Sequence, residues 1–416
     1  MKQVEARINR ERLWHTLSEL GLIGRSPTGG INRLSLDAQD LLARSHVHAL
    51  MLEAGLSVRQ DEAGNLIGRL EGDCIDAPAV ITGSHIDTVT EAGKFDGALG
   101  VLAGIEVLRT VKELGVKHHC PLEVICFTDE EGVRFGIGYL GSRAMAGEWS
   151  PEWLKAKDKD GISLNEAMIQ ADIDPSLAER AARPAGSIRA YLELHIEQGR
   201  VLEDANLPCG LATAIYGYRW LLVKFKGHAD HAGTTPMALR RDALLAAAEA
   251  VIAIEKLAIR SGGTATVGTL KLSPGAVNVI PDEVIFTIDY RHSSIQALTE
   301  MGQQMETTLE SLAFRRGLTV EVSETDGATP VTCSEQLTSM LTEVCGSIGI
   351  KAMPMVCGAG HDAVAIHSLT EIGLILVRSK DGISHHREEW SSLEDCSDGA
   401  DILLHSMLRV AQKVLK

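Results

Sequence analysis

Histidine and carboxylate side chains recur in this sequence directly after runs of residues that favour buried β-strands. His85 follows AVITGS, and Asp96 lies in the bend KFDG just before a helical run. His195 lies in LELHIEQG, and His385 follows the last strand-like run in DGISHH. A catalytic metal site needs such ligands at the ends of rigid elements, with one coordination position left open for water. The pattern predicts a metal site assembled from distant segments.

Two adjacent glutamates, Glu130 and Glu131, follow a further strand-like run, EVICFTD. Neighbouring carboxylates repel each other and resist desolvation, so burying this pair is costly without cations. The cost falls if one glutamate binds a metal and the other acts as a base. Asp87 comes two residues after His85, so in an extended backbone its carboxylate would lie on the same side and orient the imidazole.

A structural role is the alternative for each histidine. A single histidine near a strand end is more often hydrogen bonded within the fold than bound to a metal. This alternative weakens here because every candidate falls at a strand end.

The elements that must position these residues alternate between strand and helix in the first two hundred residues. Residues 100–114 place apolar side chains at steps of four, three and three, which indicates one buried helix face. Strands are expected at NLIGRL, APAVITG, PLEVICFT and AYLELHIE. This alternation predicts an α/β fold with a mostly parallel sheet, in which chemistry collects at the strand ends.

The segment 213–327 has a different pattern. LLVKFKG and EVIFTIDYR alternate with a period of two, and two helical runs cover about 240–260 and 297–314. We expect a compact β-α-β-β-α-β unit inserted into the α/β domain, which would then comprise residues 1–212 and 328–416.

Composition excludes several classes of protein. The 416 residues carry 40 basic and 56 acidic side chains, a formal charge of −16, so nucleic acid would be repelled. No run approaches about 18 consecutive apolar residues, and the N-terminal segment lacks the apolar core of a signal peptide. Eight cysteines without a CxxC pair favour reduced thiols. We therefore expect a cytoplasmic protein that binds neither nucleic acid nor membrane.

Seven motifs in order resemble the N-carbamoyl-L-amino acid hydrolase and allantoate amidohydrolase family of the two-metal aminoacylases and carboxypeptidases. They are GSHIDTV with GKFDGALGVL, FTDEEGVRF with LGSRAMAG, LELHIEQG, GHADHAGTTPM, VNVIPDEVIFTIDYR, GAGHDA and GISHHREEW. The resemblance covers nearly the whole chain. It implies an α/β fold with a two-metal aminopeptidase-like catalytic domain and an inserted ferredoxin-like α+β domain. The inserted domain would serve as a lid and as the dimerisation domain of a homodimer.

The resemblance also implies roles for individual residues. Glu130 would be the general base. Asp96 would bridge two divalent metal ions in each subunit, and these ions would be Zn²⁺ or, alternatively, Mn²⁺, Co²⁺ or Ni²⁺. One ion would be bound by His85 and His195, and the other by Glu131 and His385. The family pattern selects His385 over the adjacent His386, for which we find no role.

On the lid, the family's HAGT wording selects His231 over His228 as the residue that stabilises the oxyanion from the partner subunit. Asn278 and Arg291 would hold the substrate carboxylate. An ion pair between Arg291 and Asp289, two residues apart on one strand, is the structural alternative. Further substrate contacts are expected from Gln198 and from the backbone of the glycine-containing turn at Ala359 and Gly360, which is otherwise a plain tight turn.

The expected activity is hydrolysis of the ureido C–N bond of a small anionic substrate. The segment GKFDGALGVLAG is closer to the motif of the carbamoylases, so an N-carbamoyl-L-amino acid is favoured as substrate over allantoate or ureidoglycolate. A peptidase or aminoacylase with the same metal site is less favoured, because HIEQG and the motifs of the inserted domain resemble those of the amidohydrolases. A catalytically silent binding protein is disfavoured because every ligand position holds a competent residue type.

Overall fold

The computed structural model describes residues 6–412, and the chain divides into two compact units. The larger unit comprises Met1–Thr213 and Cys333–Lys416, and the smaller comprises Ala214–Thr332. Among the helices of the described part, none is both long enough and apolar enough to cross a membrane.

A nine-stranded sheet forms the centre of the larger unit, in the order β1-β2-β4-β3-β5-β14-β6-β12, with β13 paired to β6. The four central strands β4, β3, β5 and β14 are parallel, whereas β1, β2 and β6 join by antiparallel pairs. The strands are β1 (Ser57–Gln60), β2 (Leu66–Leu70), β3 (Ala79–His85), β4 (Leu122–Phe127), β5 (Ile188–Ile196), β6 (Cys209–Ile215), β12 (Val331–Thr332), β13 (Ala352–Cys357) and β14 (Ile372–Val377).

The predicted α/β class is confirmed, and the parallel arrangement holds for the central strands. The antiparallel outer strands were not predicted, because strand direction is not encoded in a short apolar run.

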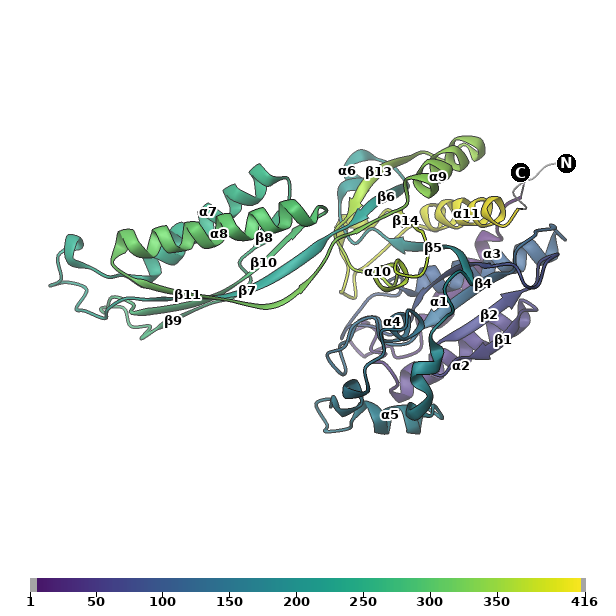
Figure 1. The fold of residues 1–416 in the computed structure, drawn as a ribbon, viewed down its shortest axis with the longest axis horizontal. Coiled ribbons are helices and arrows are strands. Elements are labelled where there is room, and N and C mark those ends of the chain that lie inside the picture. The colour runs from purple at the N-terminus through teal and green to yellow at the C-terminus, as the bar shows by residue number, and fades with distance from the viewer. Residues whose placement is uncertain (1–5, 413–416) are drawn as a thin grey trace. The chain divides into compact units, whose positions relative to one another are not determined.

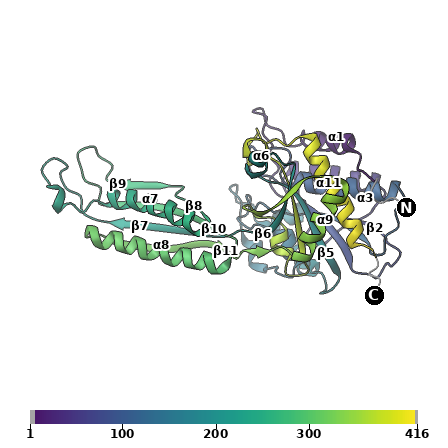
Figure 2. The same ribbon diagram turned by 90° about the horizontal axis from the view of Figure 1, so that it is seen from above.

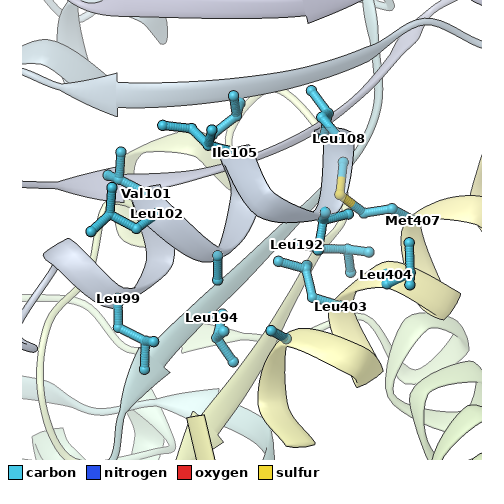
Figure 3. Packing of buried hydrophobic residues seen from close by; sticks show 14 of the residues in the cluster. Leu99, Val101, Leu102, Ile105, Leu108, Leu192, Leu194, Leu403, Leu404 and Met407 are labelled. Atoms are coloured by element: carbon cyan, nitrogen blue, oxygen red, sulfur yellow. The ribbon is translucent and has the colours of Figure 1, made fainter. Parts of the chain in front are cut away.

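The helices of the larger unit are α1 (Arg10–Leu20), α2 (Ala38–Glu53), α3 (Ala98–Glu113), α4 (Leu140–Met145), α5 (Leu164–Gln170), α6 (Val201–Ala205), α9 (Glu335–Ile348), α10 (Ala363–Ile366) and α11 (Leu393–Val410). Short 3-10 turns cover Pro151–Lys155, Pro175–Ala181 and Lys380–Gly382. Figure 3 shows α3 and α11 packing their leucines against Leu192 and Leu194 of β5. The sequence predicted one apolar face for α3, but the helix is buried on nearly every side because α1, α2 and α11 also contact it.

The smaller unit is a second antiparallel sheet, in the order β11-β7-β10-β8 with β9 also paired to β10. Figures 1 and 2 show α7 and α8 side by side along this sheet. Their apolar faces bury Val223, Phe225 and Phe286. Its elements are β7 (Gly217–Lys226), α7 (Ala243–Ser261), β8 (Thr264–Thr266), β9 (Leu270–Ser273), β10 (Glu283–His292), α8 (Ile295–Arg316) and β11 (Thr319–Ala328), with a 3-10 turn at Met237–Leu239.

Local sequence signals explain where the two long helices begin and end. Asp242 caps α7 by accepting the N–H groups of Leu244 and Leu245, and Ser294 caps α8 by accepting the N–H of Ala297. Both helices end at a glycine with positive φ, Gly262 (73°) and Gly317 (65°).

Candidate metal centre

The candidate site lies at the carboxyl ends of the parallel strands of the larger unit. His85 is the last residue of β3, and the register pairs it with Phe127 at the end of β4. Glu130 and Glu131 follow that strand end after Thr128 and Asp129. His195 lies near the end of β5, the neighbouring strand on the other side of β3. Parallel strands therefore bring side chains from separate segments to one edge of the sheet.

Asp96 reaches the same edge from the turn that precedes α3. The next residue, Gly97, has φ of 60°, which strongly favours glycine. A Cβ atom at Gly97 would lie 2.5 Å from the His85 ring. Glycine at position 97 therefore serves both the positive φ of the turn and the close approach of its backbone to the His85 ring.

The side chains form overlapping groups whose candidate ligand atoms all lie within 4.8 Å of one another. One group is His85, Asp96 and His195, and a second is Asp96, Glu131 and His385. A third combines His85 with Glu130 and Glu131. The first two groups share Asp96.

The two oxygens of the Asp96 carboxylate face different partners. Oδ1 lies 3.6 Å from Nε2 of His85 and 3.2 Å from Nε2 of His195. Oδ2 lies 3.2 Å from Nε2 of His385, which is also 3.7 Å from Glu131 Oε1. A carboxylate that divides its oxygens in this way has the arrangement needed to bridge two cations. The adjacent His386 is exposed, and its Nδ1 accepts the N–H of Glu388 instead.

Hydrogen bonds at Nδ1 leave Nε2 as the nitrogen through which two of the imidazoles can bind a metal ion. Nδ1 of His85 donates to the Asp87 carbonyl (2.9 Å), and Nδ1 of His195 donates to the Ile196 carbonyl (3.0 Å). When it is neutral, each ring therefore presents its Nε2 lone pair toward Asp96. Lone pairs and a carboxylate oxygen repel one another unless protons or a cation lie between them, so this donor set fits a divalent metal ion.

Burial and charge shift the pKa values of the cluster. Burial raises the pKa of Glu130 well above its ordinary range, and it raises the pKa of Glu131, close to Asp96, to about 7. The hydrogen bond to Asp96 raises the pKa of His385 to about 9. In the absence of a metal ion, bound protons therefore offset the negative charge of the clustered carboxylates. Metal binding would displace these protons.

Asp87 differs from the sequence prediction in how it acts on His85. Its carboxylate Oδ1 is 3.7 Å from His85 Nδ1, whereas its backbone carbonyl accepts the hydrogen bond. The two carboxylate oxygens instead accept the N–H groups of Glu130 and Glu131, each at 3.2 Å. The hydrogen bond that orients the His85 imidazole thus comes from the Asp87 backbone carbonyl rather than from the expected carboxylate, and β3 ends at His85.

Gln198 also lies at the cluster. Its Nε2 donates to Asp96 Oδ2 (3.0 Å) and to Ser384 Oγ (3.1 Å). At the predicted turn, Gly360 allows the backbone to pass the Tyr139 hydroxyl, with which a Cβ would collide. The neighbouring Ala359 accepts a hydrogen bond from the Cys357 thiol.

His231, Asn278 and Arg291 belong to the smaller unit. The segments of His231 and Asn278 are adjacent, since Ala232 N–H donates to the Asn278 carbonyl at 2.9 Å. Nδ1 of His231 accepts the N–H groups of Gly233 (3.0 Å) and Thr234 (3.2 Å), so its neutral ring carries the proton on Nε2. His228 instead pairs with Asp230.

Arg291 forms the ion pair that was the structural alternative in the sequence. Its Nε and Nη2 donate to the two oxygens of Asp289 at 2.9 and 2.8 Å. Trp220 Nε1 also donates to Asp289 at 3.0 Å, and the guanidinium lies 5.8 Å from the centre of the Tyr218 ring. These contacts hold the guanidinium in one orientation on β10.

Two residues near the cluster, Glu389 and His361, were not singled out from the sequence. Glu389 is buried and hydrogen bonds to the turn that carries Asp96. His361 packs its ring 4.3 Å from that of His195, and its Nε2 lies 3.0 Å from the Cys357 thiol. The available signal was their position inside GISHHREEW and GAGHDA, the same motifs that supplied other site residues.

Histidine and carboxylate groups that share an aspartate at the end of parallel strands define the chain as a candidate metal-dependent hydrolase of the α/β class. A family model described as peptidase family M20/M25/M40 matches residues 81–409. The chain belongs to this family.

Full-length relatives agree with the family resemblance read from the sequence. An N-carbamoyl-L-amino acid amidohydrolase of Geobacillus stearothermophilus is 47% identical over 97% of this chain and 99% of its own. An allantoate amidohydrolase of Bacillus subtilis is 35% identical over 94% and 95%. A solved structure of a hydantoinase/carbamoylase family amidase from Burkholderia multivorans matches with a TM-score of 0.94 and 34% identity, covering 99% and 100%. The sequence-based recognition is confirmed.

Proposed function

We propose that this protein is a metal-dependent amidohydrolase that cleaves the ureido C–N bond of an N-carbamoyl-L-amino acid. The products are the amino acid, carbon dioxide and ammonia. The observation that carries the proposal is the pair of ligand clusters that share Asp96, with Glu130 beside them. The 47% identity to an N-carbamoyl-L-amino acid amidohydrolase favours this substrate class.

In the proposed centre, Asp96 contributes to two divalent metal sites. His85 and His195 complete one site, and Glu131 and His385 complete the other, in agreement with two of the observed groups. Such ions polarise a carbonyl and lower the pKa of water so that hydroxide is available near neutral pH. Imidazole and carboxylate ligands suit Zn²⁺, Mn²⁺, Co²⁺ or Ni²⁺.

Glu130 is the proposed general base. It accepts a proton from the attacking water and delivers this proton to the leaving nitrogen. Its Oε2 lies 3.6 Å from His85 Nε2, so the carboxylate is at the cluster, and the Asp87 carboxylate holds its backbone N–H. Burial raises the pKa of Glu130, which makes its carboxylate a stronger base.

The smaller unit supplies the proposed substrate contacts. His231 donates its Nε2–H to the oxyanion that forms on the carbamoyl carbon, and the tautomer set by Gly233 and Thr234 supports this role. Asn278 and Arg291 bind the substrate carboxylate. We propose that the protein is a homodimer and that His231 acts in the site of the partner subunit.

Replacing Arg291 with lysine tests carboxylate recognition. Lysine keeps the charge but loses the planar fork, so KM for an N-carbamoyl-L-amino acid is expected to rise by roughly tenfold with metal content unchanged. The same substrate with its carboxylate converted to an amide should show no such difference. Arg260→Lys, at an exposed position near the end of α7, is the matched control. Equal KM values for wild type and Arg291→Lys with the acid would contradict the assignment.

Subunit mixing tests whether His231 acts across a dimer interface. His231→Ala and Glu130→Gln dimers are each expected to be inactive. After exchange, a mixed dimer has one site with both lesions and one with neither, so activity should return to about a quarter of the wild-type level when half of the dimers are mixed. Exchange is measured separately with a mass tag on one variant. No recovery after demonstrated exchange would show that His231 serves its own subunit or has another role.

A substrate panel tests the proposed activity itself. Metal-reconstituted protein is assayed with N-carbamoyl-L-amino acids, their D-enantiomers, allantoate and ureidoglycolate, with ammonia release as the common measurement. We expect the highest kcat/KM with one of the N-carbamoyl-L-amino acids. A higher kcat/KM for allantoate or ureidoglycolate would contradict the proposed substrate class and leave the proposal of metal-dependent hydrolysis intact.

A further inference from the structure

Glu389 is a buried carboxylate that contacts the segments of Asp96 and His385 without belonging to any of the candidate ligand groups. The residue is 4% exposed. Its Oε1 accepts the backbone N–H groups of Phe95 (2.9 Å) and Asp96 (3.1 Å). These two donors fix the orientation of the peptide that carries the Asp96 side chain.

The second oxygen of Glu389 connects to the segment that carries His385. Oε2 lies 2.9 Å from the hydroxyl of Ser384, and the same hydroxyl lies 3.2 Å from Asp96 Oδ2. Glu389 thus contacts both the turn before α3 and the loop after β14. Both of its oxygens already have donors, which leaves it suited to position ligands rather than to bind a metal.

A cation–π cluster joins the same two segments at a neighbouring point. The Lys94 ammonium lies 4.6, 5.1 and 4.9 Å from the ring centres of Trp14, Phe95 and Trp390. Lys94 and Phe95 belong to the Asp96 turn, and Trp390 follows Glu389. At Gly93 a Cβ would collide with the Glu389 side chain, so the turn closes tightly over the carboxylate.

We propose that Glu389 is a positioning residue that holds Asp96 and His385 in the geometry required for both metal ions. The inference rests on the proposed two-metal function. Partners that orient metal ligands typically change metal affinity by about 10- to 100-fold when removed. Because Asp96 is shared between the two sites, removing Glu389 weakens both of them, whereas removing Glu131 weakens one.

The test is a titration of the metal-free full-length protein with Zn²⁺ or Mn²⁺ by calorimetry at a temperature where every variant is folded. Glu389→Ala is expected to weaken both binding steps by about 10- to 100-fold. Glu389→Gln keeps an oxygen for the two N–H groups but cannot accept the Ser384 hydroxyl, so a smaller, several-fold loss is expected. Glu388→Gln removes the same charge from the exposed neighbouring residue and should bind as the wild type does.

Unfolding temperatures of the metal-free proteins separate positioning from a general structural role. A structural carboxylate would lower the unfolding temperature and leave metal affinity unchanged in the folded protein. Wild-type affinity in every folded Glu389 variant would overturn the inference, and if Glu389→Ala does not fold, Glu389→Gln decides. If the wild type itself binds no divalent metal, the proposed metal centre fails, and the inference fails with it. If the wild type binds metal and the Glu389 variants bind it equally well, only the inference fails.

Discussion

Replacing Glu130 with glutamine is expected to lower kcat by about 100-fold or more while the protein keeps its metal. Glutamine preserves the size of the side chain and its ability to hydrogen bond, but it cannot accept the proton of the attacking water. The Asp87 carboxylate would still hold the backbone N–H groups of residues 130 and 131, so the loop should keep its position.

Glu131→Gln is the matched comparison because it changes the same functional group one residue along. Glu131 lies in the group with Asp96 and His385, so this variant should lose metal occupancy rather than only turnover. Metal content is measured by elemental analysis and kcat by ammonia release on the same samples. Loss of metal from Glu130→Gln with full metal in Glu131→Gln would mean that the two roles are exchanged.

Prolonged chelation is expected to abolish turnover entirely. Addition of Zn²⁺, Mn²⁺, Co²⁺ or Ni²⁺ should restore it to different extents, because these ions differ in affinity and preferred geometry at imidazole and carboxylate sites. The ligand atoms of His85, Asp96 and His195 are buried and converge on one point. Without a metal ion, only protons can lie between these atoms, so removal of the metal removes the centre that activates water.

The control for chelation is a sample incubated with chelator already saturated by metal, which should keep its activity. Restoration should reach its maximum at about two equivalents per subunit if both ligand groups are occupied. Full turnover in protein shown to contain no metal would end the metal-dependent proposal. Saturation at one equivalent would restrict the centre to a single ion.

Much of the larger unit could be predicted from local patterns. β3, β4 and β5 lie where apolar, β-branched runs indicated buried strands. His85, Glu130 and His195 are at or just after the ends of these strands, and parallel order then brings them to one edge. The choice of His385 over His386 agrees with the geometry, since only His385 contacts Asp96.

Interactions between distant segments could not be predicted in the same way. Glu389 contacts Asp96 across almost three hundred residues, and no local pattern specifies that approach. The expectation for the Asp87 carboxylate assumed an extended backbone beyond residue 85, whereas β3 ends at His85 and the backbone carbonyl of Asp87 accepts the hydrogen bond. Arg291 and Asp289 were correctly placed on one face of a strand, but spacing alone could not show that they bond to each other.

The most direct test of the proposed function follows the products of a single substrate, an N-carbamoyl-L-amino acid labelled with ¹³C in its carbamoyl carbon. Metal-reconstituted wild-type protein is predicted to release the free amino acid, ammonia and labelled carbon dioxide in equal amounts. Metal-free protein and Glu130→Gln should release none above background. Release of the amino acid without ammonia, or equal turnover with and without metal, would contradict a metal-dependent hydrolysis of the ureido bond.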